Sequence, residues 1–228
     1  MNHYLHQFIF GIYPYIALAI FLLGSLIRFD REQYTWKSDS SQLLHRGSLR
    51  LGNILFHIGI IGLLFGHAAG LLTPVWVWDA LGVSHGVKQT VAMVAGGVMG
   101  LLCLVGLLML LVRRLSNARV AARSTFKDKL VLLWILLTLL LGLSSIFVSA
   151  SHMDGHMMVL LMTWAQHVVT FRGDAAGFIV DAPLIFKLHL FMGMSLFVIF
   201  PFTRLVHVWS GFGAVAYLGR TWQLVRRR

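Results

Sequence analysis

Five apolar runs, each about as long as a bilayer is thick, constrain this chain more than any other feature. A helix needs about 20 largely apolar residues to cross a membrane. The chain of 228 residues is 58% hydrophobic and 12% charged, which is typical of a polytopic membrane protein. We therefore predict an all-α integral membrane protein, a single domain over residues 1–228. Its five transmembrane helices are expected at roughly 9–27, 51–72, 89–112, 130–150 and 183–203.

The positive charges define the orientation of these helices. All but three of the 19 Lys and Arg residues lie in segments 28–50 and 113–129 and in the C-terminal tail; the exceptions are Lys88, Arg172 and Lys187. By the positive-inside rule, the N-terminus is periplasmic and the C-terminus cytoplasmic. The net charge of +11 then faces anionic lipid headgroups, so nucleic acid is not an expected partner. The first run lacks a preceding basic residue, so we interpret it as a retained helix rather than a signal peptide.

One further stretch, residues 156–171, is uncharged but contains two histidines, a glutamine and two threonines. A sixth span here would place the Arg-rich tail outside, against the charge pattern. We predict instead a helix that lies at the outer membrane interface. The tryptophans of the outer segments are interpreted as interfacial anchors; these are Trp76, Trp78 and Trp164.

Four histidines occupy the second and fifth runs, where an ionisable side chain is costly and usually functional. His57 and His67 are ten residues apart, a rise of about 15 Å, and His189 and His207 are 18 residues apart, a rise of about 27 Å. Eighteen residues make five whole turns of a continuous helix, so His189 and His207 should share one face. The two spans run antiparallel, which pairs His57 with His207 near the cytoplasm and His67 with His189 near the outside.

Two such pairs could ligate two stacked haems between the second and fifth helices. Two imidazoles per iron leave no open position, which favours electron transfer over oxygen chemistry. The C-x-x-C-H motif of c-type haem is absent, and Cys103 stands alone, so neither covalent haem attachment nor an iron–sulfur centre is expected in this chain. The ideal helix places His67 about 80° round from His57, so the two haems should not be equivalent. Pro201 should kink the fifth span.

Charged residues near the histidine levels are candidates for supporting roles. Arg50 and Arg204 are candidate contacts for the propionates of the inner haem, and Lys187 for those of the outer one. Lys88 lies at the outer mouth of the third span. It either snorkels beside headgroups or donates a hydrogen bond to a quinol oxygen, together with His67.

Glycines recur at intervals of four in the second and third runs, at Gly62, Gly66 and Gly70 and at Gly96 and Gly100. Such stripes provide room for a macrocycle or let helices approach closely, and we favour helix packing.

Across nearly its whole length the chain resembles the gamma (cytochrome b) subunit of membrane-bound respiratory nitrate reductase. The resemblance starts at FGIYPYIA and includes RFDREQYTWKSDSSQ, NILFHIGIIGLLFGH, GLLTPVWVWDALG, VKQTVAMVAGG, SASHMDG, WAQHVVTF and FKLHLFMGMSLFVIFPFTRLVHVWS. It implies two b-type haems on His57, His67, His189 and His207, and a quinol site at Lys88 and His67.

The resemblance also implies a location and partners. The chain would lie in the bacterial cytoplasmic (inner) membrane and oxidise menaquinol or ubiquinol near the outer face. Electrons would pass through the outer and inner haems to an iron–sulfur beta subunit and a molybdenum-containing alpha subunit, where nitrate is reduced.

Three alternatives stay open at this point. The chain could be the haem b anchor of another quinone-linked reductase, a histidine-lined metal transporter, or a purely structural anchor. Against the transporter, the spans show no obvious inverted repeat and few acidic groups. A structural anchor does not account for four histidines paired by depth.

Overall fold

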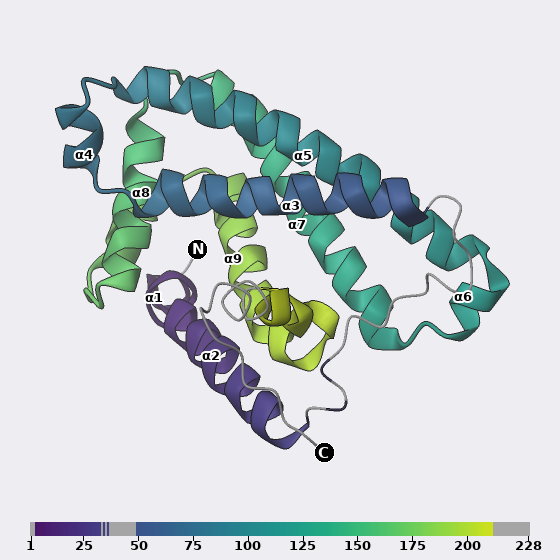
Figure 1. Ribbon diagram of the computed structural model, residues 1–228. Helices are drawn as coiled ribbons and strands as arrows, with labels where there is room; N and C mark the ends of the chain where they lie inside the picture. Colours follow the sequence, from purple (N-terminus) through teal and green to yellow (C-terminus); the bar gives the residue numbers. More distant parts are fainter. Residues whose placement is uncertain (1–2, 33, 35, 37–48, 212–228) are drawn as a thin grey trace, which may run out of the picture.

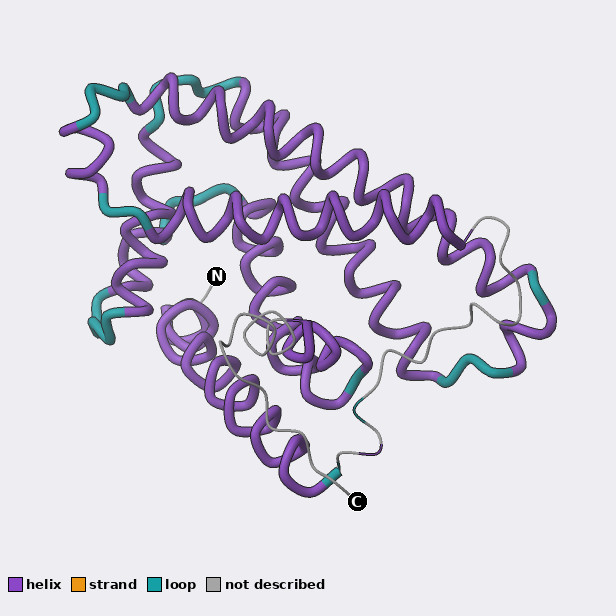
Figure 2. The backbone as a smooth tube through the Cα atoms, in the orientation of Figure 1, coloured by secondary structure: helices purple, strands orange, loops and turns teal. Residues whose placement is uncertain are grey.

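The computed structural model describes residues 3–32, 34, 36 and 49–211, and all regular structure in these residues is helical (Figure 2). Among these described residues, five helices are long and apolar enough to cross a membrane, in agreement with the predicted number of spans. They cover His3–Arg31, Leu49–Leu72, His85–Ser116, Phe126–Ala150 and Leu184–Phe202. The basic residues Lys37, Arg46, Arg220 and Arg226–Arg228, used above for the orientation, lie outside the described residues.

Short helical segments connect and extend these spans. In chain order the elements are α1 (His3–Gln7), η1 (Phe8–Ile12), α2 (Tyr13–Arg31), α3 (Leu49–Leu72), α4 (Val75–Ala80), α5 (His85–Ser116), α6 (Ala118–Ala122), α7 (Phe126–Ala150), α8 (His156–Val169), η3 (Ala175–Ile179), α9 (Leu184–Ile199), η4 (Phe200–Phe202) and η5 (Arg204–Val206).

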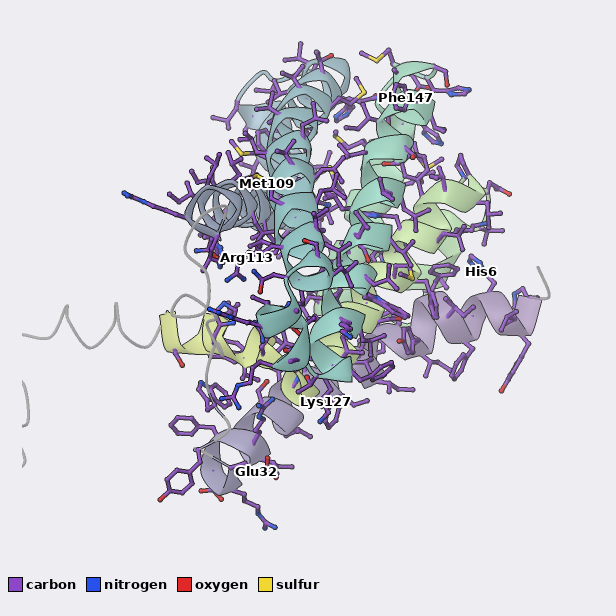
Figure 3. The ribbon with its side chains drawn as sticks, turned by 90° about the vertical axis from the view of Figure 1, so that its right-hand side faces the viewer. His6, Glu32, Met109, Arg113, Lys127 and Phe147 are labelled. Atoms are coloured by element: carbon purple, nitrogen blue, oxygen red, sulfur yellow. The ribbon has the colours of Figure 1, made fainter. Side chains whose placement is uncertain are left out.

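The long helices pack as a chain of neighbours. The most extensive interface is between α3 and α5. Smaller interfaces join α5 to α7, α7 to α9, and α9 to α2 (Figure 1). Figure 3 shows Lys127 at one end of α7 and Phe147 near the other, among side chains that are mostly carbon. Phe147 is 79% exposed and points away from the protein. Many other large apolar side chains of the long helices are exposed as well. An apolar surface of this size suits contact with lipid rather than with water.

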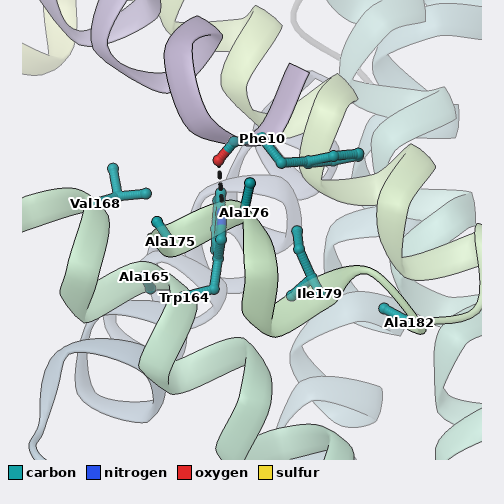
Figure 4. Packing of buried hydrophobic residues seen from close by; sticks show 8 residues of the cluster. All are labelled: Phe10, Trp164, Ala165, Val168, Ala175, Ala176, Ile179 and Ala182. Carbon is teal, nitrogen blue, oxygen red and sulfur yellow. Dashed lines mark hydrogen bonds between the residues drawn. The ribbon is translucent and has the colours of Figure 1, made fainter. Parts of the chain in front are cut away.

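Helix α8, within the ambiguous stretch 156–171, has 14 residues, fewer than the roughly 20 that a span needs. Its buried face belongs to a hydrophobic cluster with η1 and η3 (Figure 4). Trp164 is only 3% exposed, and its indole Nε1 donates a hydrogen bond to the carbonyl of Phe10 at 3.0 Å. The interpretation of Trp164 as an interfacial anchor was therefore wrong: its ring fills the core between α8 and the N-terminal helix.

The contact between α3 and α5 depends on glycines at which the two backbones nearly touch. A Cβ atom on Gly59 would lie 2.4 Å from the nitrogen of Cys103, and one on Gly106 would lie 2.2 Å from the nitrogen of Phe56. Backbone atoms cannot move aside as a flexible side chain can, so any side chain here would force the helices apart. Small residues permit this kind of approach between membrane helices.

Only some glycines of the two predicted stripes lie at helix contacts. Gly62 faces the side chain of Met99, and Gly100 faces that of Leu143, as expected for packing positions. Open space surrounds the position of a Cβ atom on the remaining glycines of the stripes, which are Gly66, Gly70 and Gly96. The packing interpretation was wrong for these three. Gly66 follows Gly59 by seven residues and so lies on the same face of α3. The two helices separate on the α4 side of their close contact, and this leaves Gly66, Gly70 and Gly96 open (Figure 1).

The fifth span does not continue as one helix to His207. Helix α9 ends at Ile199, and two short 3₁₀ segments with Pro201 in the first of them follow. The guanidinium of Arg28 on α2 donates to the carbonyls of Pro201 and Thr203, at 2.7 and 2.8 Å. These bonds satisfy acceptors that the broken helix leaves open. The expected kink is thus a helix break, and the prediction of five continuous turns between His189 and His207 was wrong.

Candidate functional site

The structure brings the four histidines of the second and fifth spans together in two pairs. The ring centroids of His57 and His207 are 6.3 Å apart, with 67° between the ring planes. Those of His67 and His189 are 6.0 Å apart, with 35° between the planes. These are the two pairs expected from depth, and their different angles make the two places non-equivalent.

Each of the four imidazoles uses the same nitrogen for a hydrogen bond. Nδ1 lies near a backbone carbonyl in every case: Asn53 for His57, Leu63 for His67, Thr138 for His189 and Arg204 for His207. A carbonyl can only accept, so Nδ1 carries the proton. In the neutral ring Nε2 then has a free lone pair, which is the arrangement by which proteins prepare histidine as a metal ligand.

The spacing within each pair matches that of two axial ligands on one metal ion. A histidine nitrogen bonds a first-row metal at about 2 Å. With about 1.2 Å from each nitrogen to its ring centroid, two ligands on opposite sides of one iron need centroids roughly 6.4 Å apart. The observed 6.3 and 6.0 Å agree with this value. Two imidazoles joined directly by a hydrogen bond would not need their centroids this far apart.

Room for a flat group is present beside the pair of His67 and His189. Gly70 follows His67 by three residues and Gly193 follows His189 by four, so each lies close to the histidine on its helix face. A Cβ atom at either glycine would meet nothing within 4 Å. In the part of the chain that the structure describes, α3 and α9 form no extended packing interface with each other. The histidines therefore reach towards one another between helices that are not tightly joined.

A buried charge cluster lies at the end of the protein near His207. Both Nε and Nη2 of Arg204 lie 2.7 Å from Oδ1 of Asp128, and Nη1 of Arg114 lies 3.2 Å from Oδ2. Asp128 also accepts a hydrogen bond from the nitrogen of Thr125, which completes the capping box of α7. Arg204 thus fastens the segment after α9 to α5 and α7.

The candidate propionate contacts differ in their surroundings. Arg204 is engaged with Asp128, so its guanidinium is already neutralised in part. Arg50 is exposed in the first turn of α3 and makes no ion pair with another described residue. Lys187 donates to the carbonyl of Val180 at 2.5 Å. A propionate role stays a prediction for all three side chains.

Lys88 lies in the first turn of α5 and is only 6% exposed. Its ammonium donates to Sδ of Met162 at 2.6 Å and lies 4.5 Å from the centroid of the Trp78 ring. The lysine is therefore enclosed between α4 and α8 instead of snorkelling to the surface. A thioether is a weak acceptor, so an incoming phenolic oxygen would be the better partner for this ammonium.

Gln89, next to Lys88, fixes the loop between α7 and α8. Its amide nitrogen donates to the carbonyls of Ser149 and His152, at 2.9 and 2.8 Å, and its oxygen accepts from the nitrogen of Gly155 at 2.8 Å. Gln89 is 4% exposed, and these bonds use both ends of its amide. The arrangement holds α8, and with it Met162, against the start of α5.

Beyond the spans, His167 at the end of α8 bonds the carboxylate of Asp174 at 2.7 Å. This hydrogen bond from His167 is the main cause that lowers the pKa of the Asp174 carboxyl below its usual range. The pair closes the loop between α8 and η3.

Several residues that shape the site were missed by the sequence reasoning. Asp128 carried a signal, because it is the single acidic residue between Arg113 and Lys129 in a strongly basic segment. Gln89 carried a weaker one, as a polar residue within an apolar run. Thr138 contributes through its backbone carbonyl, which no side-chain pattern could reveal.

Comparison with known proteins agrees with this architecture. Residues 6–228 match the model of the nitrate reductase gamma subunit family. The chain is 50% identical over 225 residues to the respiratory nitrate reductase 1 gamma chain of Escherichia coli (strain K12), covering 99% of both proteins. It is 47% identical to the respiratory nitrate reductase 2 gamma chain of the same organism, covering all of both. It is 36% identical to the nitrate reductase gamma chain of Bacillus subtilis (strain 168), covering 97% of this chain and 98% of that one. The chain therefore belongs to the nitrate reductase gamma subunit family.

Proposed function

We propose that this chain is the quinol-oxidising, di-haem membrane subunit of a respiratory nitrate reductase. One observation carries the proposal: four histidines with protonated Nδ1 stand in two pairs whose ring spacing would let both imidazoles of a pair hold one metal ion. His57 and His207 would hold the inner haem b, and His67 and His189 the outer one. When bound, the haems supply one-electron transfer, since two histidines leave the iron no open position.

The quinol site is proposed at the outer end, on Lys88 and His67. Quinol oxidation releases two electrons and two protons and leaves the quinone. The Lys88 ammonium would exchange its bond to Met162 for one to a quinol oxygen and stabilise the negative charge that develops there. The two protons leave to the outer side.

The two electrons are consumed when nitrate and two protons become nitrite and water. That step needs a molybdenum-containing alpha subunit, supplied with electrons by an iron–sulfur beta subunit. We place both on the cytoplasmic side, against the basic segments. Proton release outside and proton uptake inside make the overall reaction electrogenic.

The alternatives fit the described residues less well. A metal transporter needs several ligands around one ion, whereas no group of three or more His, Cys, Asp or Glu suited to a metal is found among the described residues. Membership of the nitrate reductase gamma family favours nitrate over another terminal acceptor.

Replacement of one outer ligand tests the proposal. His67→Ala should remove the outer haem, retain the inner one and abolish quinol-dependent nitrate reduction by the purified complex. His156→Ala, at an exposed histidine at the start of α8, is the matched control and should leave both haems and turnover unchanged. Undiminished quinol-dependent turnover in a His67→Ala complex that lacks the outer haem would contradict the mechanism.

A further inference from the structure

The ring of His189 lies against a place on α7 where a side chain is missing. A Cβ atom on Gly142 would lie 2.8 Å from Cε1 of His189, 3.3 Å from Nδ1 and 3.5 Å from Nε2. The edge of the ring with both nitrogens therefore faces this glycine. An added methyl group would contact the imidazole itself, at a distance that real Cβ atoms essentially never show.

One turn before Gly142, α7 also provides the hydrogen-bond acceptor for this ring. Nδ1 of His189 donates to the carbonyl of Thr138 at 3.0 Å. In a regular helix this carbonyl already accepts from the nitrogen four residues on, which is that of Gly142. A side chain at Gly142 would stand beside the carbonyl and hinder a second donor from the neighbouring helix.

His189 differs in this respect from the other three histidines. His57 and His67 bond carbonyls four residues earlier in their own helix, and His207 bonds one three residues earlier. Their tautomers are set locally. The orientation of His189 depends instead on how α7 lies beside α9, and a second bond fastens these helices: Nε1 of Trp134 donates to the carbonyl of Met192 at 3.0 Å.

We propose that Gly142, together with the carbonyl of Thr138, is the positioning element for the outer haem ligand. This inference rests on the proposed function, because it assigns to α7 the control of a histidine held to be an axial ligand. The slot fixes the plane of the His189 ring and the protonation of Nδ1, and so directs the Nε2 lone pair towards His67. The outer pair depends on this slot, and the inner pair does not.

The test compares two glycine-to-alanine variants in the purified complex. Gly142→Ala places its methyl group against the imidazole. Gly100→Ala, on α5, is the matched control. Its Cβ atom would meet Cδ2 of Leu143 at a similar 2.6 Å, but this atom is the flexible end of an aliphatic side chain on α7, the helix that carries Gly142. Haem per chain, the redox titration of each haem and the electron paramagnetic resonance (EPR) spectrum of the oxidised protein are measured. The His67→Ala variant identifies which signal belongs to the outer haem.

Gly142→Ala should lower haem from two towards one per chain, or shift the potential and EPR signal of the outer haem alone. The inner haem should keep its wild-type signals and so report an intact fold. Gly100→Ala should match the wild type in both haems. Unchanged outer signals in Gly142→Ala would overturn the inference, and so would equal loss of both haems, because the glycine would then serve helix packing in general. A wild-type complex without haem would instead refute the proposed function itself.

Discussion

Replacement of Asp128 by asparagine removes the negative charge between two guanidinium groups, the buried one of Arg114 and the half-buried one of Arg204. The side chains of Arg114, Asp128 and Arg204 are 10%, 11% and 19% exposed. Breaking a buried ion pair by removing one partner costs about 3–5 kcal/mol, because the remaining charges lose their compensation. Since all three groups retain some contact with solvent, we expect the lower end, about 3 kcal/mol. That corresponds to a factor of roughly 10² in the unfolding equilibrium.

Asparagine isolates the charge from the helix cap. Its amide oxygen can still accept the bond from the nitrogen of Thr125, which the capping box of α7 requires. Asp128→Ala loses this bond as well and should be destabilised by about a further 1 kcal/mol. Asp181→Asn, at an exposed aspartate outside the spans, is the matched control and should cost less than about 0.5 kcal/mol.

The assay is reversible denaturation of the purified protein in mixed micelles, with the haem proposed for His57 and His207 recorded in the same samples. The carbonyl of Arg204 accepts the Nδ1 proton of His207, so loosening Arg204 should disturb the pair of His207 with His57 and spare that of His67 with His189. A free energy of unfolding within about 0.5 kcal/mol of the wild type, with an unchanged signal of the haem proposed for His57 and His207, would refute the reasoning.

Three further perturbations test other parts of the structure. Gly106→Ala should destabilise the protein by about 1–3 kcal/mol or more in the same denaturation assay, because its methyl group would meet the backbone of α3; wild-type stability would contradict the close approach. Trp164→Phe keeps an aromatic ring in the core but loses the Nε1 donor to the carbonyl of Phe10. It should lower the free energy of unfolding by about 1–3 kcal/mol. His167→Ala should raise the pKa of Asp174 towards its usual value. Because the lowered pKa stabilises the folded state only while the carboxyl is ionised, the resulting loss of stability should be present above a pH of about 4 and fade as the pH falls through the lowered pKa. A loss independent of pH would exclude this origin.

The depth of each histidine could be predicted from the sequence, because the rise per residue of a helix varies little. When the two spans run antiparallel, only one pairing places the histidines of each pair at the same depth: His57 with His207, and His67 with His189. The direction of His207 could not be derived in this way, since the helix breaks at Pro201. Whether a proline kinks or breaks a helix depends on groups elsewhere that satisfy the freed carbonyls, and here Arg28 provides them.

The packing glycines show a second limit of sequence reasoning. A period of four identifies a glycine face, but the crossing of the neighbouring helix decides which glycines are in contact. Helix α5 lies against Gly52 and Gly59 and leaves Gly66 and Gly70 open. Contacts such as that of Gly142 with His189 join residues of different helices, and only the folded structure brings them together.

The central claim is that two non-equivalent haems lie between α3 and α9. The reduced-minus-oxidised spectrum of the purified complex, with haem quantified per chain, tests this claim most directly. The account predicts two b-type haems, reduced by a quinol analogue and reoxidised by nitrate, with two distinct low-spin EPR signals because the ring planes meet at 67° in one pair and 35° in the other. A complex that contains this chain, supports nitrate reduction and carries no haem on it would contradict the account.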